Sequence, residues 1–253
     1  MDTRISKPIK VIVLAAGMGK RMRTEGNDLP KVMREANGRP LLAYVLDALD
    51  FIPPGDIVIV VGYGRDIVTR AFPAYSSAVQ ERQMGTGHAV QSAMETLADY
   101  EGDVLVCCGD MPLIKRETYK ALVERHRSGD GQCTLLTGPS SDKLPYGRII
   151  RGDDGEFLDI REDRDCSAEE LLITELNSGV YVFDAGQLRW ALGRLRSDNS
   201  QGEYYLTDVP KILASRGVRV DVCLRELGNE IVGVNTPEQL AEVEAALTAA
   251  GNS

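Results

Sequence analysis

Two glycines and several cations that follow the first apolar segment are residue types that can bind a polyphosphate. Gly17 and Gly19 come directly after the apolar run 9–16, and glycines at such a turn let backbone N–H groups approach an anion closely. The nearby cations are Lys20, Arg21, Arg23 and Lys31. A P-loop would need glycine in place of Leu14, and the dinucleotide-binding fingerprint would need glycine in place of Met22. The pattern therefore indicates a polyphosphate-binding turn that is neither a P-loop nor a dinucleotide-binding loop. A tight turn between a strand and a helix would also need glycine, so this interpretation stays open as well.

One carboxylate lies where a parallel sheet would present it to a ligand. Asp110 follows the apolar run 103–108, and Pro112 prevents the strand from continuing. Ligands of doubly wound sheets bind at the carboxyl ends of strands, and a carboxylate there is a suitable ligand for Mg²⁺. The same aspartate could instead begin a turn or cap the next helix, so the residues alone leave both interpretations open.

A third segment combines amide side chains with a glycine-rich helix start. Gln80 and Gln83 can read the edge of a base, because each carries a paired donor and acceptor. Gly85 and Thr86 open the predicted helix, whose first N–H groups and positive dipole end favour an anion. We interpret His88, in the same segment, as a structural residue rather than a catalytic base.

The apolar pattern places these segments on a sheet flanked by helices. Short apolar runs predict strands at 9–16, 56–61, 103–108, 147–151, 156–161, 178–183 and 218–224. Helical spacing predicts helices at 40–49, 87–100, 116–127, 188–195 and 237–249. Alternating strands and helices indicate right-handed βαβ units, a mostly parallel sheet and an α/β fold. The short strands after Thr137 are expected to extend this sheet or cover its edge, which predicts a single domain.

Composition and charge narrow the class of protein. The chain has 253 residues, of which 43% are hydrophobic and 26% charged, and this excludes a disordered chain, a collagen-like repeat and a disulfide scaffold. Residues 1–40 contain nine Lys/Arg and four Asp/Glu, a net +5, so the rest of this −9 chain carries −14. A cationic patch on an acidic body suits a small polyanion and argues against nucleic acid as a partner.

Cysteine usage and hydropathy indicate the compartment. Five cysteines, an odd number without CxxC spacing, fit the reduced thiols of a cytoplasmic protein better than disulfides or a zinc site. The sequence contains no run of about 18 apolar residues, and its first residues do not have the pattern of a secretory signal. We therefore expect no membrane segment, while the oligomeric state is not indicated.

Taken together and in order, these segments resemble the sugar-1-phosphate nucleotidyltransferases. The similarity is to the uridyltransferase domain of the bacterial N-acetylglucosamine-1-phosphate uridyltransferases, and it covers residues 9–245. The matching pieces are Leu14-Ala-Ala-Gly-x-Gly-x-Arg-Met22, Pro30-Lys-Val32, Gln80-x-x-Gln-x-Gly-Thr-Gly-His-Ala89, Gly109-Asp-x-Pro-Leu113, Tyr146-Gly-Arg-Ile149, Glu162, Leu176-Asn-Ser-Gly-Val180, Gln201-Gly-Glu-Tyr-Tyr-Leu-Thr-Asp208 and Gly233-Val-Asn235. Each piece is weak alone, but nine in the expected order make a specific match.

The resemblance implies a Rossmann-like mixed, mostly parallel sheet flanked by helices, in a single domain spanning 1–253. Within it, we expect a nucleotide-binding half at about 9–137, a sugar-binding half at about 138–235 and a C-terminal helix at 236–253. The implied nucleotide-binding residues are Leu14, Ala15, Ala16, Gly17, Gly19, Lys31, Gln80, Gly85, Thr86, Cys108 and Gly109. Those implied for the sugar are Gly147, Glu162, Asn177 and Tyr204.

The resemblance also implies the catalytic groups and a metal cofactor. Arg21, Lys31 and Asp110 are the implied catalytic residues. Asp110 and Asn235 are the implied ligands of Mg²⁺, although Asn235, taken alone before Thr236 and Pro237, is equally suited to cap a helix.

The implied reaction transfers a uridylyl group from UTP to N-acetylglucosamine 1-phosphate and releases pyrophosphate. A phosphate monoester is mostly dianionic at pH 7, so the nucleophile needs no general base, and the chain has only two histidines. Transfer to another sugar phosphate or from another NTP, such as glucose 1-phosphate or dTTP, and a non-catalytic sugar-nucleotide sensor remain alternatives.

This sequence departs from the family pattern in several places. Lys20 stands where threonine is usual, the stretch 22–29 looks longer than usual, and Cys108 stands where some members have an aromatic residue. No hexapeptide repeat of a left-handed β-helix follows the last predicted helix. Acetyltransferase activity and trimerisation through such a β-helix are therefore not expected.

Overall fold

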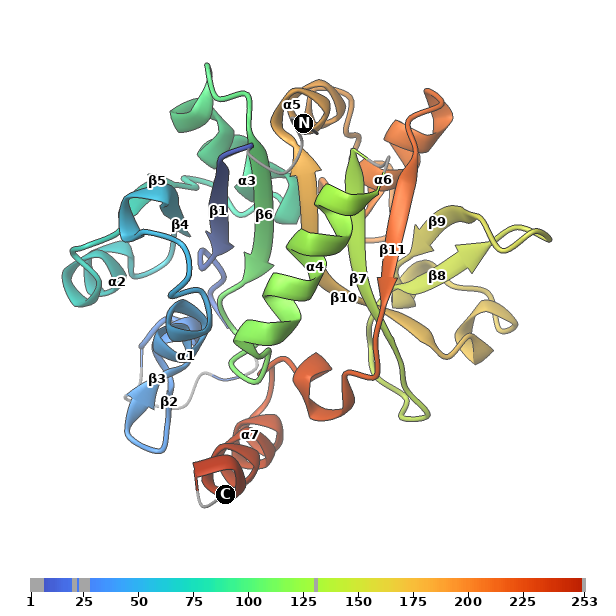
Figure 1. Ribbon diagram of the computed structural model, residues 1–253. Coiled ribbons are helices and arrows are strands. Elements are labelled where there is room, and N and C mark those ends of the chain that lie inside the picture. Colours follow the sequence, from blue (N-terminus) through green and yellow to red (C-terminus); the bar gives the residue numbers. More distant parts are fainter. Residues whose placement is uncertain (1–6, 20–21, 23–27, 130–131, 252–253) are drawn as a thin grey trace.

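A computed structural model describes residues 7–19, 22, 28–129 and 132–251. Within this part of the chain, nine strands form a central sheet, and seven of them follow the order β11-β7-β10-β6-β1-β4-β5 (Figure 1). The strands of the sheet are β1 (Ile9–Leu14), β4 (Ile57–Val61), β5 (Ser76–Val79), β6 (Asp103–Cys108), β7 (Cys133–Pro139), β8 (Arg148–Arg151), β9 (Phe157–Arg161), β10 (Glu175–Asp184) and β11 (Val220–Leu224). β2 (Glu35–Ala36) and β3 (Arg39–Pro40) form a separate small hairpin.

The sheet is mixed and mostly parallel, as the resemblance implies. β1 pairs in parallel with β4 and β6, β4 with β5, and β7 with β11. β10 runs antiparallel to both of its neighbours, β6 and β7. It also pairs with β8, and β8 pairs in turn with β9, both antiparallel. The strands after Thr137 therefore extend the same sheet, which confirms the expected single-domain architecture.

Helices cover both faces of the sheet. They are α1 (Leu41–Ala48), α2 (Arg65–Ala71), α3 (Thr86–Met94), α4 (Arg116–Ser128), α5 (Ala185–Leu192), α6 (Asp208–Ser215) and α7 (Pro237–Gly251). Short 3₁₀ helices lie at Lys31–Met33, Pro54–Asp56, Glu95–Leu97, Asp163–Asp165, Glu170–Leu172 and Gly228–Ile231. α1, α2 and α4 pack on one face, and α3, α5 and α6 pack on the other (Figure 1).

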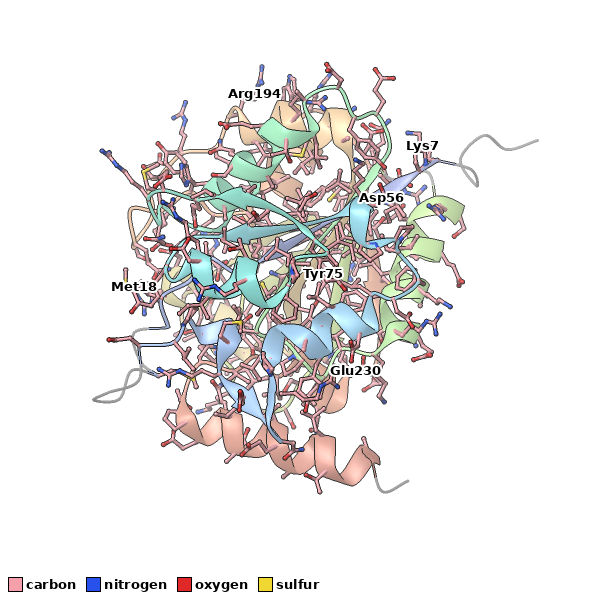
Figure 2. The ribbon with its side chains drawn as sticks, turned by 90° about the vertical axis from the view of Figure 1, so that its left-hand side faces the viewer. Lys7, Met18, Asp56, Tyr75, Arg194 and Glu230 are labelled. Carbon is pink, nitrogen blue, oxygen red and sulfur yellow. The ribbon has the colours of Figure 1, made fainter. Side chains whose placement is uncertain are left out.

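Burial on both faces of the sheet explains why the sequences of the central strands are continuously apolar. Along β1, Val11 and Val13 face the α1–α4 side, whereas Ile12 faces the α3–α5 side, and all three are fully buried. A strand covered on both faces keeps no polar alternation. Met18 beyond the carboxyl end of β1 and Lys7 before its amino end lie on opposite sides of the molecule (Figure 2).

The last helix, α7, is joined to the small β2–β3 hairpin. Asn37 in the turn of this hairpin donates its backbone N–H to Glu244 Oε1 (3.2 Å) and its side-chain amide to Thr248 Oγ1 (3.1 Å). Among the helices of the described residues, none is both long and apolar enough to cross a membrane.

Several elements of the described chain differ from the sequence predictions, among them the small β2–β3 hairpin, which was not predicted. α2, β5, β7 and α6 were not predicted, and the helix expected at 87–100 is α helical only to Met94. The predicted helix 188–195 begins earlier, at Ala185, because Asp184 caps it by accepting the backbone N–H of Gln187 (3.1 Å). The expected boundary at 137/138 falls inside β7, so the division into a nucleotide half and a sugar half stays a prediction about ligands.

Candidate active site

Two adjoining cavities open at one edge of the sheet. The parallel strands β1, β4, β5 and β6 all end at this edge, and the amino end of antiparallel β10 lies there as well. The first, which we call the glycine-loop cavity, has a volume of about 230 Å³. The second, which we call the β10 cavity, has a volume of about 210 Å³. The two share Leu14, Thr86, Cys108 and Asp110, so a ligand in one lies beside a ligand in the other.

Most residues predicted from the sequence line these two cavities. Those in the glycine-loop cavity are Leu14, Ala16, Gly17, Lys31, Gln80, Gly85, Thr86, Cys108 and Asp110. Those in the β10 cavity, besides the shared four, are Gly147, Glu162, Asn177 and Asn235. Ala15, Gly109, Gly19 and Tyr204 line neither cavity, and Arg21, with Lys20 and Arg23, lies outside the described residues.

The turn after β1 presents backbone to the glycine-loop cavity. A Cβ at Gly17 would meet no atom within 4 Å, so nothing in the described chain requires glycine there, and the position is open for a ligand to approach the backbone. Gly19 is required by the chain itself, because its φ is +63° and a Cβ would lie 2.7 Å from Cβ of Lys31. Ala15 and Gly109 are buried behind this turn, where Gly109 N–H donates to Leu14 O (2.9 Å).

Gln80 is held with its amide nitrogen turned toward the protein. The side chain is 3% exposed, and Nε2 donates to Gly85 O (3.0 Å) and to His88 Nδ1 (3.0 Å). Both bonds use Nε2, so Oε1 is the atom that can accept a hydrogen bond from a ligand in the cavity. His88 therefore orients Gln80, which agrees with its interpretation as a structural residue.

The glycines at the start of α3 allow the chain near Tyr204 to approach closely. A Cβ at Gly85 would lie 2.5 Å from Tyr204 O, and Gly87 N–H donates to the same oxygen (2.8 Å). Thr86 Oγ1 accepts the N–H of Leu206 (3.0 Å). Tyr204 thus acts here through its backbone, and a sugar contact of its side chain stays a prediction.

Lys31, Asp110 and Asn235 meet between the two cavities. Lys31 Nζ forms an ion pair with Asp110 Oδ2 and donates to Asn235 Oδ1 (3.0 Å). The side chains of Lys31 and Asp110 are only 17% and 15% exposed. Val234 N–H donates to Asp110 O (2.9 Å), and this backbone bond brings the segment of Asn235 beside the end of β6.

Neither Asp110 nor Asn235 caps a helix. The next helix after Asp110 is α4, which begins only at Arg116. At α7, the cap is Thr236, whose Oγ1 accepts the N–H of Gln239 (3.3 Å), while Gln239 Oε1 accepts the N–H of Asn235 (2.8 Å). The start of α7 therefore holds the backbone of Asn235, and the Asn235 side chain does not cap the helix.

The donor set fits a hard divalent cation. One carboxylate and one amide oxygen converge on a single cationic group, the Lys31 ammonium. Mg²⁺ in proteins is commonly held by one or two such oxygens, with substrate phosphates and water completing its coordination. The described residues contain no cluster of three or more His, Cys, Asp or Glu that would hold a metal alone.

The β10 cavity is shaped by a bulge in β10. The pairing of β10 with β7 shifts register between Asn177 and Tyr181, and Gly179 within this bulge has a φ of +75°. Asn177, 7% exposed, donates from Nδ2 to Tyr181 Oη (2.7 Å), and its Oδ1 accepts the N–H of Gly179 (3.2 Å). Bulges of this kind re-aim side chains beside active sites.

Gly147 and Glu162 line the β10 cavity together with Asn177. Gly147 O accepts the N–H of Asn177 (2.8 Å), and a Cβ at Gly147 would lie 2.7 Å from Cγ2 of Ile160. Glu162 Oε1 accepts a hydrogen bond from Thr207 Oγ1 (2.8 Å). Burial raises the pKa of the Glu162 carboxyl, and the bond from Thr207 opposes this shift.

Tyr146 and Thr207 are among the residues of the β10 cavity that were not predicted as site residues. Tyr146 Oη accepts the N–H of Gly233 (2.8 Å), and burial raises the pKa of this hydroxyl to about 12. Both residues lie inside quoted motif segments, 146–149 and 201–208. The sequence signal for Tyr146 and Thr207 was therefore their position beside residues that had been predicted to contact the sugar.

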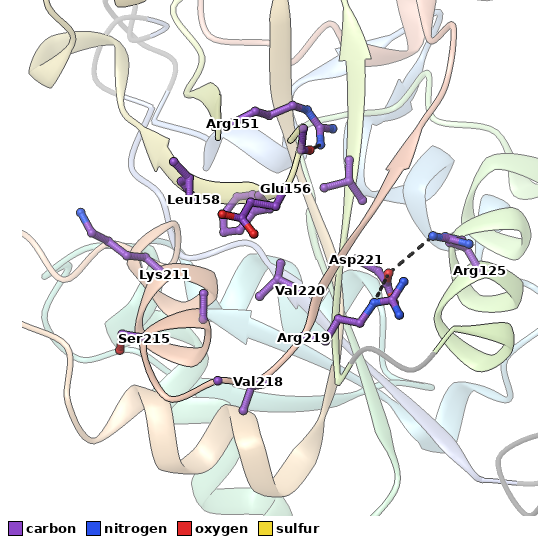
Figure 3. Close-up of a pocket in the computed structure, with 15 residues that line it drawn as sticks. Arg125, Arg151, Glu156, Leu158, Lys211, Ser215, Val218, Arg219, Val220 and Asp221 are labelled. Atoms are coloured by element: carbon purple, nitrogen blue, oxygen red, sulfur yellow. Dashed lines mark hydrogen bonds and ion pairs between the residues drawn. The ribbon is translucent and has the colours of Figure 1, made fainter. Parts of the chain in front are cut away.

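A separate cavity of about 740 Å³ lies between β9, α6 and β11 (Figure 3). Its cations are paired with carboxylates of the chain. Arg125 and Arg219 contact Asp221, Lys211 contacts Asp159, and Arg151 contacts Glu175. The cations that line this cavity are therefore neutralised by the chain's own carboxylates, whereas Lys31 of the candidate site lies where two cavities meet.

Comparison with known proteins assigns the family. Residues 11–160, more than half of the chain, match the family described as "MobA-like NTP transferase domain". The chain belongs to this family. Curated relatives include "Bifunctional protein GlmU" of Corynebacterium efficiens (44% identical over 245 residues), of Streptomyces coelicolor (44% over 247) and of Pelotomaculum thermopropionicum (41% over 237).

The extent of these matches matters for what they imply. They cover 94%, 95% and 93% of this chain but 50%, 51% and 51% of the respective relatives. This NTP transferase domain therefore spans about half the length of the curated relatives it matches. The family-level expectation, a nucleotidyltransferase on a mixed sheet, is confirmed.

Proposed function

We propose that this protein transfers a uridylyl group from UTP to N-acetylglucosamine 1-phosphate, giving UDP-N-acetylglucosamine and pyrophosphate. The observation that carries the proposal is the convergence of Asp110 and Asn235 on one cationic centre between two adjoining cavities. Two phosphorylated substrates that repel each other need such a centre between them. The similarity to GlmU proteins over nearly the whole chain supports this choice of substrates.

The glycine-loop cavity is proposed to bind UTP. The backbone from Leu14 to Gly19 would receive the phosphates, with Arg21 and Lys31 on the triphosphate. Gln80, with Gly85 and Thr86, would read uracil, because Gln80 Oε1 can accept the N3–H of the base. Ala15, Ala16, Cys108 and Gly109 would form the wall behind the nucleotide.

The β10 cavity is proposed to bind the sugar phosphate. Gly147, Glu162 and Asn177 would contact the N-acetylglucosamine, with the segment of Tyr204 at its rim. A buried site of paired polar groups rejects an analogue that lacks the matching hydroxyl or amide, because its own groups are left without partners. Sugar selection would therefore depend on this cavity.

The reaction needs charge neutralisation more than proton transfer. The sugar phosphate is mostly dianionic at pH 7, so it can attack the α-phosphorus in line without a base. Lys31 and Arg21 would neutralise the departing pyrophosphate. Asp110 and Asn235 would hold Mg²⁺, which supplies charge neutralisation for the phosphates of both substrates when it is bound.

The setting of the protein is proposed on similar grounds. Its partners would be the small-molecule substrates, without nucleic acid. All five cysteines are free, as expected in the reducing cytoplasm.

The deciding test is pyrophosphate release across a matrix of NTPs and sugar 1-phosphates with Mg²⁺. We expect release above all with UTP and N-acetylglucosamine 1-phosphate. Asp110→Asn should keep the fold and lower kcat by about 10²–10³-fold, the cost of removing one charged transition-state contact. Asp142→Asn, at an exposed loop position, is the matched control and should leave kcat unchanged.

Other outcomes would redirect the proposal. Release with dTTP or glucose 1-phosphate instead would assign a different nucleotidyltransferase specificity. UDP-sugar binding without release from any pair would indicate a sensor. Turnover of Asp110→Asn close to that of the wild type would contradict the role of Asp110.

A further inference from the structure

Arg148 is a buried arginine beside the β10 cavity that takes no part in the proposed ligand contacts. Its side chain is 5% exposed, at the first position of β8. In the sheet it is paired with Leu176, the residue before Asn177, and with Arg161, the residue before Glu162. Arg148 therefore lies between the segments that carry two of the proposed sugar contacts.

The guanidinium of Arg148 joins two walls of this cavity. Nη1 donates to the backbone oxygens of Leu144 (3.1 Å) and Tyr146, which belong to the segment that leads into Gly147. The same nitrogen donates to Asp163 Oδ1 (3.0 Å), and Asp163 directly follows Glu162. One nitrogen atom thus connects the wall of residues 144–147 with the wall of residues 162–163.

Burial makes this connection strong. A buried charge is costly unless it is paired and hydrogen-bonded. Nη1 of Arg148 has an ion pair with Asp163 and two backbone acceptors, whereas its buried Nε has no hydrogen-bond partner among the described residues. The buried charge therefore depends on the bonds of Nη1. Charge-assisted hydrogen bonds are roughly twice as strong as neutral ones. Movement of either wall away from the other would break bonds to a charge that has little access to water.

We infer that Arg148 is a positioning residue that sets the spacing of the two walls of the β10 cavity and so determines affinity for the sugar phosphate. This inference rests on the proposed function. The walls that Arg148 holds include Gly147 and Glu162. Tyr146, whose backbone oxygen Arg148 bonds, in turn accepts the N–H of Gly233 with its hydroxyl. None of these residues lines the glycine-loop cavity, so nucleotide affinity should not depend on Arg148.

The test compares substitutions of Arg148 with a matched arginine on the same strand. Arg148→Met should raise the KM for sugar phosphate about tenfold or more, the size of a lost hydrogen bond to a charged group, with the KM for UTP changed less than about twofold. Arg148→Lys should recover part of this loss, because one cationic nitrogen makes all three bonds. Arg151→Met removes an arginine that contacts Glu175 and lines the other cavity, and it should change neither KM.

A second substitution covers the case in which Arg148→Met does not fold. Asp163→Asn keeps an acceptor oxygen but removes the charge that pairs with Arg148, so it should lower the melting temperature while the protein still folds. It should raise the same KM by a smaller factor than Arg148→Met. Equal changes in both KM values, or a loss of stability with neither KM changed, would overturn the inference. So would an Arg151→Met variant that behaves like Arg148→Met.

The inference and the proposed function fail in different ways. A wild-type protein without turnover on any pair of substrates contradicts the proposed function. In that case, calorimetric titration with UDP-N-acetylglucosamine and with UMP still tests Arg148. Weaker binding of the UDP-sugar to Arg148→Met, with UMP binding unchanged, supports the inference, and equal loss or no loss for both ligands overturns it.

Discussion

Gly17 stands at a position where the protein has room for a side chain. A Cβ there meets nothing within 4 Å, and its backbone φ is not among the positive values. Alanine should therefore fold without strain but occupy space proposed for phosphate. We expect Gly17→Ala to raise the KM for UTP about tenfold, as for a lost hydrogen bond to a charged group, at an unchanged melting temperature.

Gly55 offers a matched control for this substitution. It is exposed in the 3₁₀ helix before β4, and a Cβ there also meets nothing within 4 Å. Gly55→Ala should leave both stability and the KM for UTP unchanged. A Gly17→Ala variant with normal UTP kinetics would argue against phosphate binding at this turn.

Lys31 competes with any cation for Asp110 and Asn235 when no nucleotide is bound, because its ammonium contacts both. Lys31→Met should lower kcat by about 10²-fold, since a cation on the pyrophosphate is lost. The same substitution should tighten binding of Mn²⁺ to the nucleotide-free protein, measured by electron paramagnetic resonance titration. Lys115→Met, which removes an exposed lysine paired with Glu230, is the control. Unchanged or weaker Mn²⁺ binding would refute this competition.

Individual site residues were predictable where they follow strands, but their contacts were not. Asp110 was found because a polar residue directly after an apolar run reaches the ligand-binding edge of a sheet. Gln80 was found from its amide group ahead of a glycine-rich helix start. The meeting of Lys31 with Asn235, and the bonds of Arg148 to two walls, depend on tertiary packing between distant segments. No spacing in the sequence encodes such distances.

At the scale of elements, the start of α6 contains a carboxyl with an altered pKa. Desolvation and the nearby carboxylate of Asp159 raise the pKa of Asp208 from 3.8 to about 6. The folded protein therefore binds a proton more readily than the unfolded chain, and stability from this group falls as pH rises from about 4 to 6.

Asp208→Asn removes this dependence. The melting temperature of the variant relative to the wild type should increase between pH 4 and pH 7, by a few degrees for about 1 kcal/mol. Calorimetry at both pH values measures this difference. A difference that is constant with pH would contradict the raised pKa.

The elements missing from the sequence predictions share a weak local signal. α2 buries only Val68, and β5 buries only Ala78, so neither has a clear apolar period. β7 ends in Thr137, Gly138 and Pro139, and glycine and proline are typical of turns. Pairing with β10 nevertheless keeps all three residues extended, and Thr137 also pairs with β11. Tertiary pairing overrides local propensity here.

α6 was missed for a different reason. It contains Pro210, which usually breaks a helix, but the proline lies in the first turn, where its missing N–H is not needed. The strands β1, β4 and β6 and the helices α1, α4 and α7 were predicted because each has a sustained apolar run or helical apolar spacing. Local patterns therefore miss even buried elements, such as β7 and α6, where glycine or proline interrupts the pattern.

At the scale of the whole molecule, both proposed halves share one sheet. We expect unfolding in a single cooperative transition, with far-UV circular dichroism coinciding with the fluorescence of Trp190, the one tryptophan, on α5. A calorimetric enthalpy equal to the van't Hoff enthalpy would agree. Two resolved transitions would mean that the halves are separate folding units.

The antiparallel strand β10 has a consequence for how substrates enter. It is bonded to β7 along one side, and on the other side to β6 and, near its amino end, to β8. Its own residues border the β10 cavity. A hinge motion between the two proposed halves would have to break these hydrogen bonds. We therefore do not expect the two halves to close over the substrates as the domains of two-domain enzymes do. We expect substrates to enter through movement of the loops around the two cavities, while the central sheet beneath them keeps its shape.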